Sequence, residues 1–262
     1  MLPKIYKDLF TLEGIAGYEK SVKKYMEKEM RKYPNFDIKK DHLGSIFGVK
    51  KAKDPNAKVV MIAGHMDEVG LMVVGITDKG MLKVHNVGSL NGEVFISQVL
   101  NVHTKNGVIK GVIGALPPHL RSTQQTKISD LLLDVGAKDK KHAQQMGVAL
   151  GQMVCFDNPF FVTANKDRII SKAIDNRFGC GLALEAMEKF NDIELPFTLI
   201  CGATVQEEVG LRGAETSVNM HKPDLFIALD ASPVNDMSQG QPLGALGEGF
   251  LLRIYDPRNT ML

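Results

Sequence analysis

Three short apolar runs along the chain are each followed by histidine or acidic side chains. The runs span residues 59–64, 197–201 and 225–229, and the polar residues after them are His65, the pair Glu207 and Glu208, and Asp230. Continuous apolar runs with β-branched residues are typical of strands buried on both faces of a parallel sheet. Because ligands bind beyond the carboxyl ends of the strands in open α/β sheets, this pattern predicts a site that brings these side chains together.

Two other stretches have helical spacing. The first covers about residues 19–33, with an apolar face of Val22, Tyr25, Met26 and Met30. The second begins near Lys172 and continues through Met187. It places Asp175 in its first turn, where small polar residues cap a helix and anions are favoured, so Asp175 is a fourth acidic candidate for the site.

The pattern changes between about Gly75 and Asn165. Short strands are expected over residues 81–84, 98–103 and 108–113, and the dipeptides Asn91-Gly92 and Asn106-Gly107 are typical of hairpin turns. We therefore expect an α/β fold with a mixed or parallel sheet and helices on both faces, made from residues 1–74 and 166–262. A small β-barrel is expected as an insertion over residues 75–165, and a further strand over residues 250–255.

Composition narrows the class of protein. The chain has 262 residues, 44% of them hydrophobic and 24% charged, as is usual for a globular protein. Its formal net charge of +2 is too small to indicate binding to nucleic acid or to a membrane. We expect a cytoplasmic protein, because no apolar run reaches a spanning length and Cys155, Cys180 and Cys201 form an odd set without paired spacing.

The adjacent glutamates indicate hydrolytic chemistry. Neighbouring side chains of an extended segment point to opposite sides, so one of Glu207 and Glu208 can hold a metal while the other faces the substrate. Hydrolysis needs that division, because a ligand cannot also be a free general base. One imidazole with several carboxylates suits Zn, Co or Mn, and two metals that share a carboxylate would use the set better than one. Asp67 is placed to accept the other N–H of His65.

Each residue also has a simpler interpretation when it is taken alone. His65 could be a structural histidine, Asp175 only a helix cap, Asp230 a turn residue, and the glutamate pair part of a solvated face. The ordered set of four segments favours the metal site over these alternatives. The remaining candidates His85, His103, His119, His142 and His221 lie outside any ligand-like setting.

Four motifs resemble those of one family. Residues 63–70 read AGHMDEVG, residues 173–177 read AIDNR, residues 205–214 read VQEEVGLRGA and residues 229–233 read LDASP. Their order and spacing resemble the dinuclear-metal aminopeptidases of the M42 family, and within it the glutamyl aminopeptidases of Gram-positive bacteria. The similarity runs from the first helix to the end of the chain.

The resemblance implies a role for each site residue. His65 and Asp230 would hold one metal ion, Asp175 would bridge two ions, and Glu208 would hold the second. Glu207 would be the general base and Asp67 would orient His65. The ions would be zinc or cobalt, the partner a peptide substrate, and the assembly a homo-oligomer built from dimers into a dodecamer, with the inserted barrel as the dimerisation domain.

The chain departs from the family at its end. Members supply a further histidine ligand from a C-terminal segment, and this chain ends at Leu262 before such a segment. We therefore expect an incomplete second metal site in a metal-dependent aminopeptidase, with a possible preference for N-terminal Glu or Asp. The alternatives are an inactive truncated fragment or non-catalytic assembly subunit, and a glycoside hydrolase, which would need two carboxylates across a sugar and no metal.

Overall fold

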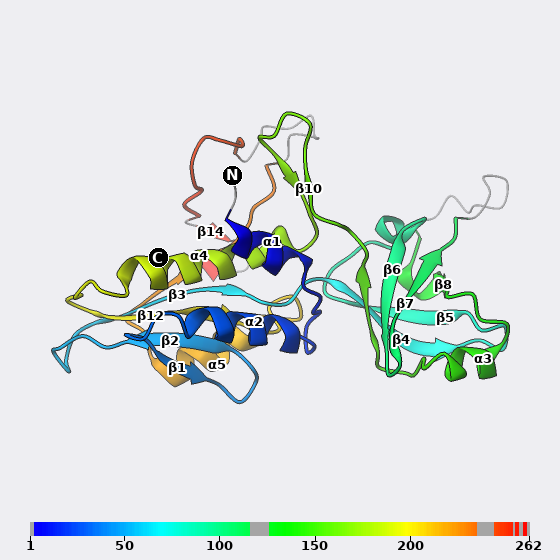
Figure 1. Ribbon diagram of the computed structural model, residues 1–262, viewed down its shortest axis with the longest axis horizontal. Coiled ribbons are helices and arrows are strands. Elements are labelled where there is room, and N and C mark those ends of the chain that lie inside the picture. The colour runs from blue at the N-terminus through cyan, green and yellow to red at the C-terminus, as the bar shows by residue number, and fades with distance from the viewer. Residues whose placement is uncertain (1–2, 116–125, 235–243, 254, 257–258, 261–262) are drawn as a thin grey trace.

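The computed structural model describes residues 3–115, 126–234, 244–253, 255–256 and 259–260. Figure 1 shows an α/β unit on the left and a β-barrel on the right. The strands of the α/β sheet are β1 (Asp37–Lys40), β2 (Ile46–Lys50), β3 (Val59–His65), β12 (Thr198–Thr204) and β13 (Leu225–Ala228). Their order across the sheet is β1-β2-β12-β3-β13. Strands β12, β3 and β13 run parallel, whereas β2 pairs antiparallel with both β1 and β12.

Helices cover both faces of this sheet (Figure 1). The helices of the α/β unit are α1 (Lys4–Thr11), α2 (Lys20–Met30), α4 (Ile174–Phe190) and α5 (Arg212–His221). Apolar residues of α1, α2 and α4, among them Leu9, Met26 and Leu184, form one core with β12. On the opposite face of the sheet, His221 of α5 packs edge-on against Phe47, with 5.0 Å between ring centroids. None of the helices in the described residues is long and apolar enough to cross a membrane.

The barrel closes from six strands in the order β4-β5-β8-β7-β6-β9. These are β4 (Gly70–Ile76), β5 (Leu82–Val87), β6 (Val99–Thr104), β7 (Gly107–Ile113), β8 (Leu132–Asp134) and β9 (Met153–Phe156). A second apolar core fills it, where Phe95 stacks on Phe156. The short elements η1 (Gly92–Phe95), η3 (Ile128–Asp130) and α3 (Lys140–Gln145) connect its strands. The predicted mixed α/β fold with a small β-barrel is thus confirmed, and the barrel begins at Gly70, ahead of residue 75.

Two short ribbons complete the described chain. Strands β10 (Phe161–Val162) and β11 (Ile169–Ile170) form a hairpin beside the segment that returns from the barrel, and β14 (Tyr255–Asp256) pairs with β15 (Asn259–Thr260). The predicted strand over residues 250–255 is wrong over residues 250–253, which have no regular structure. Since Phe250 is 89% exposed, its apolar run has no packed surface to align it.

Two other expectations differ from the structure, and one helix was not expected. The turn Asn91-Gly92 opens η1 instead of a hairpin: Asn91 has extended dihedral angles (φ −83°, ψ 144°) and not the positive φ that an Asn-Gly hairpin turn requires. Strand β13 is an edge strand, and Leu225 is 52% exposed, so it is not buried on both faces. Helix α1 went unpredicted. The turn Asn106-Gly107 does join β6 to β7, as expected.

Candidate active site

The parallel strands bring the polar residues that follow them to one edge of the sheet. His65 is the last residue of β3, and it lies opposite Thr204, the last residue of β12. Asp230 lies two residues beyond the end of β13, whose Ala228 pairs with Ala63. The shared direction of these strands therefore places the two glutamates after β12 and Asp230 on either side of His65.

Carboxylate oxygens surround one nitrogen of the buried His65 ring. The Nε2 atom lies 3.1 Å from Oδ1 of Asp175, 3.7 Å from Oε2 of Glu207 and 3.9 Å from Oδ1 of Asp230. The Nδ1 atom faces Asp67 instead, at 3.1 Å from its carbonyl oxygen and 3.5 Å from Oδ1. Asp67, in the connection between β3 and β4, thus holds the Nδ1 side of the ring. The Nε2 side faces three acids that come from three other segments.

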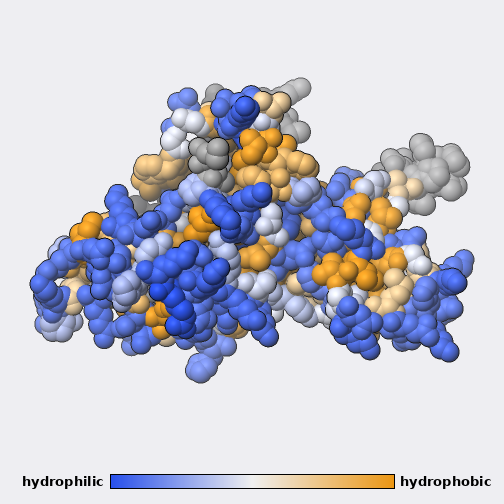
Figure 2. Space-filling model, viewed as in Figure 1, coloured by the Kyte–Doolittle hydropathy of each residue, from blue (hydrophilic) through white to orange (hydrophobic). Residues whose placement is uncertain are grey.

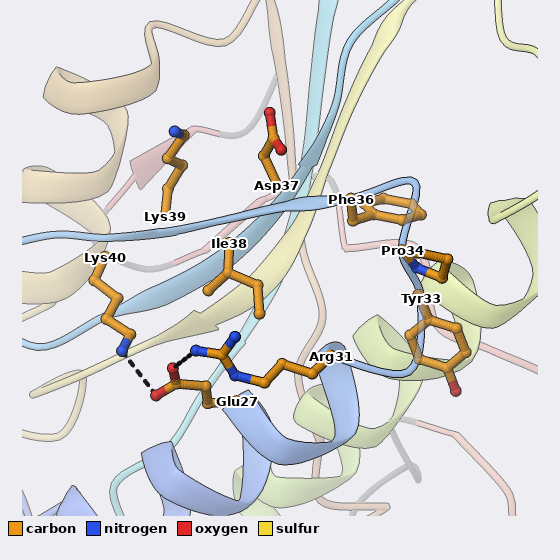
Figure 3. A pocket seen from close by; sticks show the side chains of 9 residues that line it. All are labelled: Glu27, Arg31, Tyr33, Pro34, Phe36, Asp37, Ile38, Lys39 and Lys40. Carbon is orange, nitrogen blue, oxygen red and sulfur yellow. Dashed lines mark hydrogen bonds and ion pairs between the residues drawn. The ribbon is translucent and has the colours of Figure 1, made fainter.

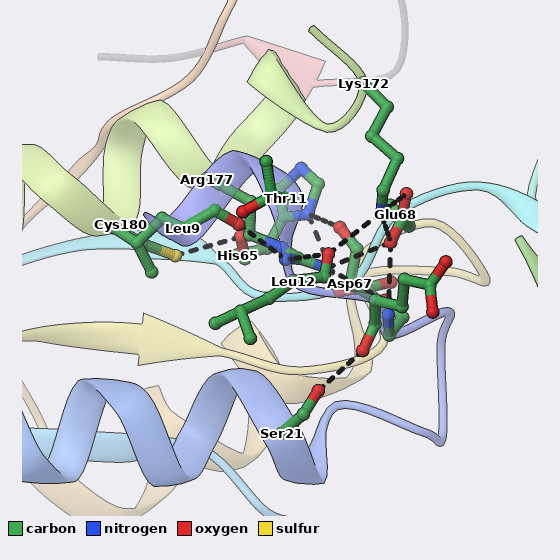
Figure 4. Close-up of polar contacts among 12 residues, drawn as sticks. Leu9, Thr11, Leu12, Ser21, His65, Asp67, Glu68, Lys172, Arg177 and Cys180 are labelled. Atoms are coloured by element: carbon green, nitrogen blue, oxygen red, sulfur yellow. Dashed lines mark hydrogen bonds and ion pairs between the residues drawn. The ribbon is translucent and has the colours of Figure 1, made fainter. Parts of the chain in front are cut away.

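Asp67 connects the histidine, beside which it lies in Figure 4, to the glutamate pair. Its fully buried carboxylate accepts hydrogen bonds from the backbone N–H groups of Glu207, at 3.1 Å, and Glu208, at 3.0 Å. Burial would raise the pKa of Asp67, but the hydrogen bond with His65 and those two amides outweigh it, and the pKa is lowered. Asp67 therefore stays ionised and fixes both the imidazole and the backbone of the pair.

Asp175 does not cap helix α4. Asp175 and Asn176 have non-helical dihedral angles, and the Asn176 Oδ1 accepts the N–H of Gly179 at 3.0 Å. This is the hydrogen bond that an N-cap residue makes to the third residue of the helix. The Asn176 amide also donates to the Leu229 carbonyl at 2.6 Å, next to Asp230. Because Asn176 caps the helix, the Asp175 carboxylate is left to face His65.

The crowded acids change one another's ionisation. Burial, then repulsion from Asp175, Glu207 and Asp67, raises the pKa of Glu208 to about 7, with His65 opposing the shift. Burial and neighbouring carboxylates also raise the pKa values of Glu207 and Asp230. Burial alone would lower the pKa of His65, but the hydrogen bonds that its ring donates to Asp175 and Asp67 raise the pKa to about 10.

This donor set fits a divalent cation. A cation among the carboxylates favours their ionised forms and displaces the protons that they and the imidazole otherwise hold. Two sets of three residues each offer donor atoms that all lie within 4.8 Å of one another. One set is His65, Glu207 and Asp230, and the other is His65, Asp175 and Glu208. Glu207 is as near to His65 as Asp230 is, so distances do not separate a ligand from a base, and the individual roles stay predictions.

A third group of possible donors was missed by sequence reasoning. His103 of β6 lies with Glu13 and Cys155 at the junction between the barrel and the loop before α2. These residues are far apart in sequence, and only the pairing of β6 with β9 brings Cys155 beside His103. Glu13 accepts hydrogen bonds from the His103 ring and from Asn101, so the group is an ion-paired contact between barrel and α/β unit.

The other histidines set aside above have local roles where the structure describes them. His142 accepts the N–H of Lys138, His221 packs on Phe47 and His85 lies exposed on β5, while His119 lies outside the described residues. The three cysteines are free and buried. Burial raises the pKa of the Cys201 thiol to about 12, which agrees with a core position and not with a nucleophile.

A hollow of about 530 Å³ lies elsewhere, between α2 and the edge strand β1 (Figure 3). Three of its charged groups pair with one another, since Glu27 lies 2.6 Å from Arg31 and 2.7 Å from Lys40. Its lining includes neither histidine nor cysteine. The hollow therefore lacks the imidazole that stands among the acids around His65.

Comparisons with known proteins agree with this geometry. The sequence profile described as M42 glutamyl aminopeptidase matches residues 44–262. The chain is 42% identical to a glutamyl aminopeptidase of Lactococcus lactis, over 98% of this chain and 73% of the relative.

Solved structures show the same similarity. A TET aminopeptidase from a marine sediment archaeon, Thaumarchaeota archaeon SCGC AB-539-E09, superposes with a TM-score of 0.87 at 32% identity, over 94% of this chain and 70% of that one. The TET1 peptidase of Pyrococcus horikoshii, described as able to assemble into a tetrahedron or a large octahedral shell, has a TM-score of 0.78 at 33% identity, over 88% and 70%. The chain therefore belongs to the M42 peptidase family.

Proposed function

We propose that the protein is a metal-dependent aminopeptidase that removes N-terminal residues from short peptides. The observation that supports this most directly is the His65 ring, whose Nε2 has carboxylate oxygens from Asp175, Glu207 and Asp230 within 3.9 Å. Membership of the M42 family supports the same reaction class. An imidazole among several acids suits zinc or cobalt, which accept nitrogen and oxygen donors.

The residues divide into ligands and proton carriers. His65, Asp175, Glu208 and Asp230 would hold the metal. When bound, the metal polarises the scissile carbonyl and lowers the pKa of the attacking water. Glu207, whose pKa is raised by burial and by Asp230, takes the proton of that water and delivers it to the leaving amine. Asp67 keeps the imidazole in its orientation by accepting from Nδ1.

The proposed assignment of ligands gives unequal metal sites. His65, Asp175 and Asp230 would supply three ligands to one ion, the usual number for a catalytic zinc. A second ion would have Asp175 and Glu208 among the described residues, one ligand fewer. We therefore expect one metal ion to bind tightly and a second to bind weakly, with water completing its coordination.

One cation near the site supports a preference for acidic N-terminal residues. Arg253 donates to the Ser232 hydroxyl at 3.1 Å, and its charge acts on the Asp230 carboxyl, where it opposes the rise in pKa that burial produces. A guanidinium beside the metal ligands is suited to pair with the carboxylate of an N-terminal Glu or Asp. The Lactococcus lactis relative is a glutamyl aminopeptidase by name.

We also propose that the protein is a cytoplasmic homo-oligomer assembled through its barrel. Val74, Val108 and Leu150 of the barrel are 50%, 53% and 65% exposed, and Figure 2 shows apolar side chains gathered over this part of the surface. Such patches mark contact surfaces in soluble proteins. The Pyrococcus horikoshii relative is known by its description to assemble.

The test compares cleavage of glutamyl, aspartyl, leucyl and lysyl p-nitroanilides with and without a chelator, followed by zinc or cobalt. We expect cleavage to require metal and to be fastest with acidic residues. Arg253→Gln should lose at least ~10-fold in kcat/KM for glutamyl substrate, with a smaller change for leucyl, as an unpaired substrate charge is costly. The surface variant Arg31→Gln is the control. Metal binding without cleavage would favour the assembly-subunit alternative, and chelator-resistant hydrolysis of a glycan would contradict the proposal.

A further inference from the structure

A second ionic cluster lies directly behind the carboxylates, and its members are buried. The Lys172 ammonium lies 2.7 Å and 2.9 Å from the two carboxylate oxygens of Glu68, and the Arg177 guanidinium lies 3.4 Å from one of them. Their side chains are 6%, 4% and 0% exposed, respectively, for Lys172, Glu68 and Arg177. Figure 4 shows the Lys172 side chain extended toward Glu68, beside Asp67 and His65.

Each member is close in sequence to a residue of the proposed active site. Glu68 follows Asp67, and in the extended connection from β3 to β4 their side chains point to opposite sides. Asp67 reaches the amides of the glutamate pair, whereas Glu68 reaches Lys172 and Arg177. Lys172 and Arg177 in turn flank Asp175 on the segment that enters α4.

The cluster also holds the N-terminal loop, residues 12–19. The Arg177 guanidinium donates to the carbonyls of Leu12, at 3.1 Å, and Gly14, at 3.2 Å, and Lys172 donates to the Leu12 carbonyl at 2.8 Å. Glu68 accepts the N–H of Gly14 at 3.1 Å, and its own N–H donates to the Gly14 carbonyl at 3.0 Å. The loop is thereby joined to the end of β3 and to the start of α4.

The same loop reaches the third element of the site. The buried Glu19, at the end of the loop, accepts the N–H of Gln206 at 3.1 Å, immediately before the glutamate pair. The residue Gln206 has a positive φ of 56°, so the turn after β12 is held in a conformation that this contact helps to maintain. Three of the four segments that supply the proposed ligands, namely the end of β3, the start of α4 and the turn after β12, therefore meet one loop and one buried cluster.

A buried ion cluster of this kind contributes little net stability, because desolvation of the charges offsets their attraction. What it does provide is fixed geometry, since every partner is charged and oriented. Groups that orient metal ligands from behind typically change metal affinity when they are replaced. We propose that Glu68, Lys172 and Arg177 are positioning residues that set the orientation of Asp67 and Asp175 for metal binding. The metal chemistry of this inference rests on the proposed function.

The test is a double variant that removes one pair of charges and keeps volume. Glu68→Gln/Lys172→Met should bind zinc ~10–100-fold more weakly by isothermal titration calorimetry than the parent chain, the range typical of residues that orient ligands. Its melting temperature without metal should stay near the parental value. The matched control is Glu29→Gln/Lys32→Met, which removes another buried glutamate, on α2, and its lysine partner just beyond the end of that helix. This control should leave zinc affinity unchanged.

Kinetics give a second readout. Positioning predicts a fall in kcat that exceeds any change in KM, and partial recovery in Lys172→Arg, which restores a cation beside Glu68. If the double variant does not fold, Lys172→Arg alone remains testable, because a shifted cation should still weaken zinc binding measurably. A double variant with parental zinc affinity and a lowered melting temperature would show a merely structural cluster and overturn the inference. A parent chain that binds no zinc would instead contradict the proposed function.

Discussion

Two ionic clusters lie back to back on either side of Asp67 and Glu68, and they differ in how their charges are balanced. Around His65, four carboxylates from three segments of the chain face one imidazole, and three of them have raised pKa values. Around Glu68, one carboxylate faces a lysine and an arginine and accepts a backbone N–H. The first cluster has an excess of acids, and the second has its own cations.

This difference teaches what each cluster is suited to. A carboxylate that already has a buried cationic partner has no free charge to offer an ion, so the Glu68 cluster can only hold its surroundings in place. The acids around His65 repel one another, and burial and this repulsion raise the pKa values of Glu207, Glu208 and Asp230. A divalent cation therefore lowers their free energy more than it would that of paired groups. Adjacent residues of one short segment thus belong to opposite electrostatic environments.

The largest effect is expected from Glu207→Gln. The amide keeps the shape of the side chain and loses the proton acceptor, so we expect kcat to fall by ~10²–10⁴ while metal content is unchanged. Elemental analysis and steady-state kinetics measure the two quantities on the same sample. Glu215→Gln, on the exposed side of α5, is the control. Loss of metal in Glu207→Gln would mean that Glu207 is a ligand and that the roles of the glutamate pair are exchanged.

Asp175→Ala tests whether the acid-rich cluster is a metal site. Because Asp175 would be shared by two ions, its loss should weaken the binding of both ions. The loss of affinity should be at least the ~10–100-fold that is typical when a residue that only orients a ligand is replaced. The helix should remain, since Asn176 provides its cap, so the far-ultraviolet circular dichroism of the metal-free variant should match the parent. Asn176→Ala, in contrast, removes the cap and should lower the free energy of unfolding by about 1 kcal/mol, while the metal ligands remain. One ion retained at parental affinity in Asp175→Ala would contradict a bridging role.

The pH dependence of stability sharpens the comparison further. The pKa of Glu208 is raised to about 7 in the folded, metal-free protein, against an ordinary value of 4.5. The folded state therefore holds this proton more tightly than the unfolded state does. The resulting contribution to folding stability is complete below the ordinary pKa of 4.5 and is lost as the pH rises through the folded pKa of about 7. We expect the metal-free melting temperature to fall between about pH 5 and pH 8, and zinc to reduce that fall.

Glu208→Gln provides the check on that dependence. It should flatten the decline in the metal-free protein, whereas Glu93→Gln on the exposed barrel surface should not. An unchanged decline in Glu208→Gln would assign the dependence to other groups of the cluster, such as Glu207 and Asp230.

The smallest effect is expected at the contact between barrel and α/β unit. Burial alone would raise the pKa of Glu13, but hydrogen bonds from His103 and Asn101 lower it. Glu13 therefore contributes stability above its ordinary pKa, and this is lost as the pH falls through the lowered folded value. Glu13→Gln should lower the melting temperature by a few degrees at neutral pH and by less in acid. An equal loss at both ends of the pH range would show that its charge is unimportant.

Much of the fold could be predicted because the signals are local. The runs before His65 and Asp230 have the composition of strands, and their common position at strand ends is enough to predict one site at one sheet edge. The glycine at position 107 fixed one hairpin through its turn chemistry. The hairpin predicted at Asn91-Gly92 is wrong, because Asn91 has extended dihedral angles, and Gly92 packs closely against Thr126, a contact distant in sequence that no local pattern contains.

By itself, the sequence determined the mixed α/β fold, the inserted barrel and the set of residues that meet around His65, since strand periodicity and the order of motifs are properties of short segments. Only the tertiary structure decided which of two adjacent polar residues makes which contact. It assigned the helix cap to Asn176 and not Asp175, turned Glu68 away from the acids toward Lys172 and Arg177, and joined His103 to Glu13. These choices depend on contacts between residues far apart in the chain, whose energies no local pattern contains.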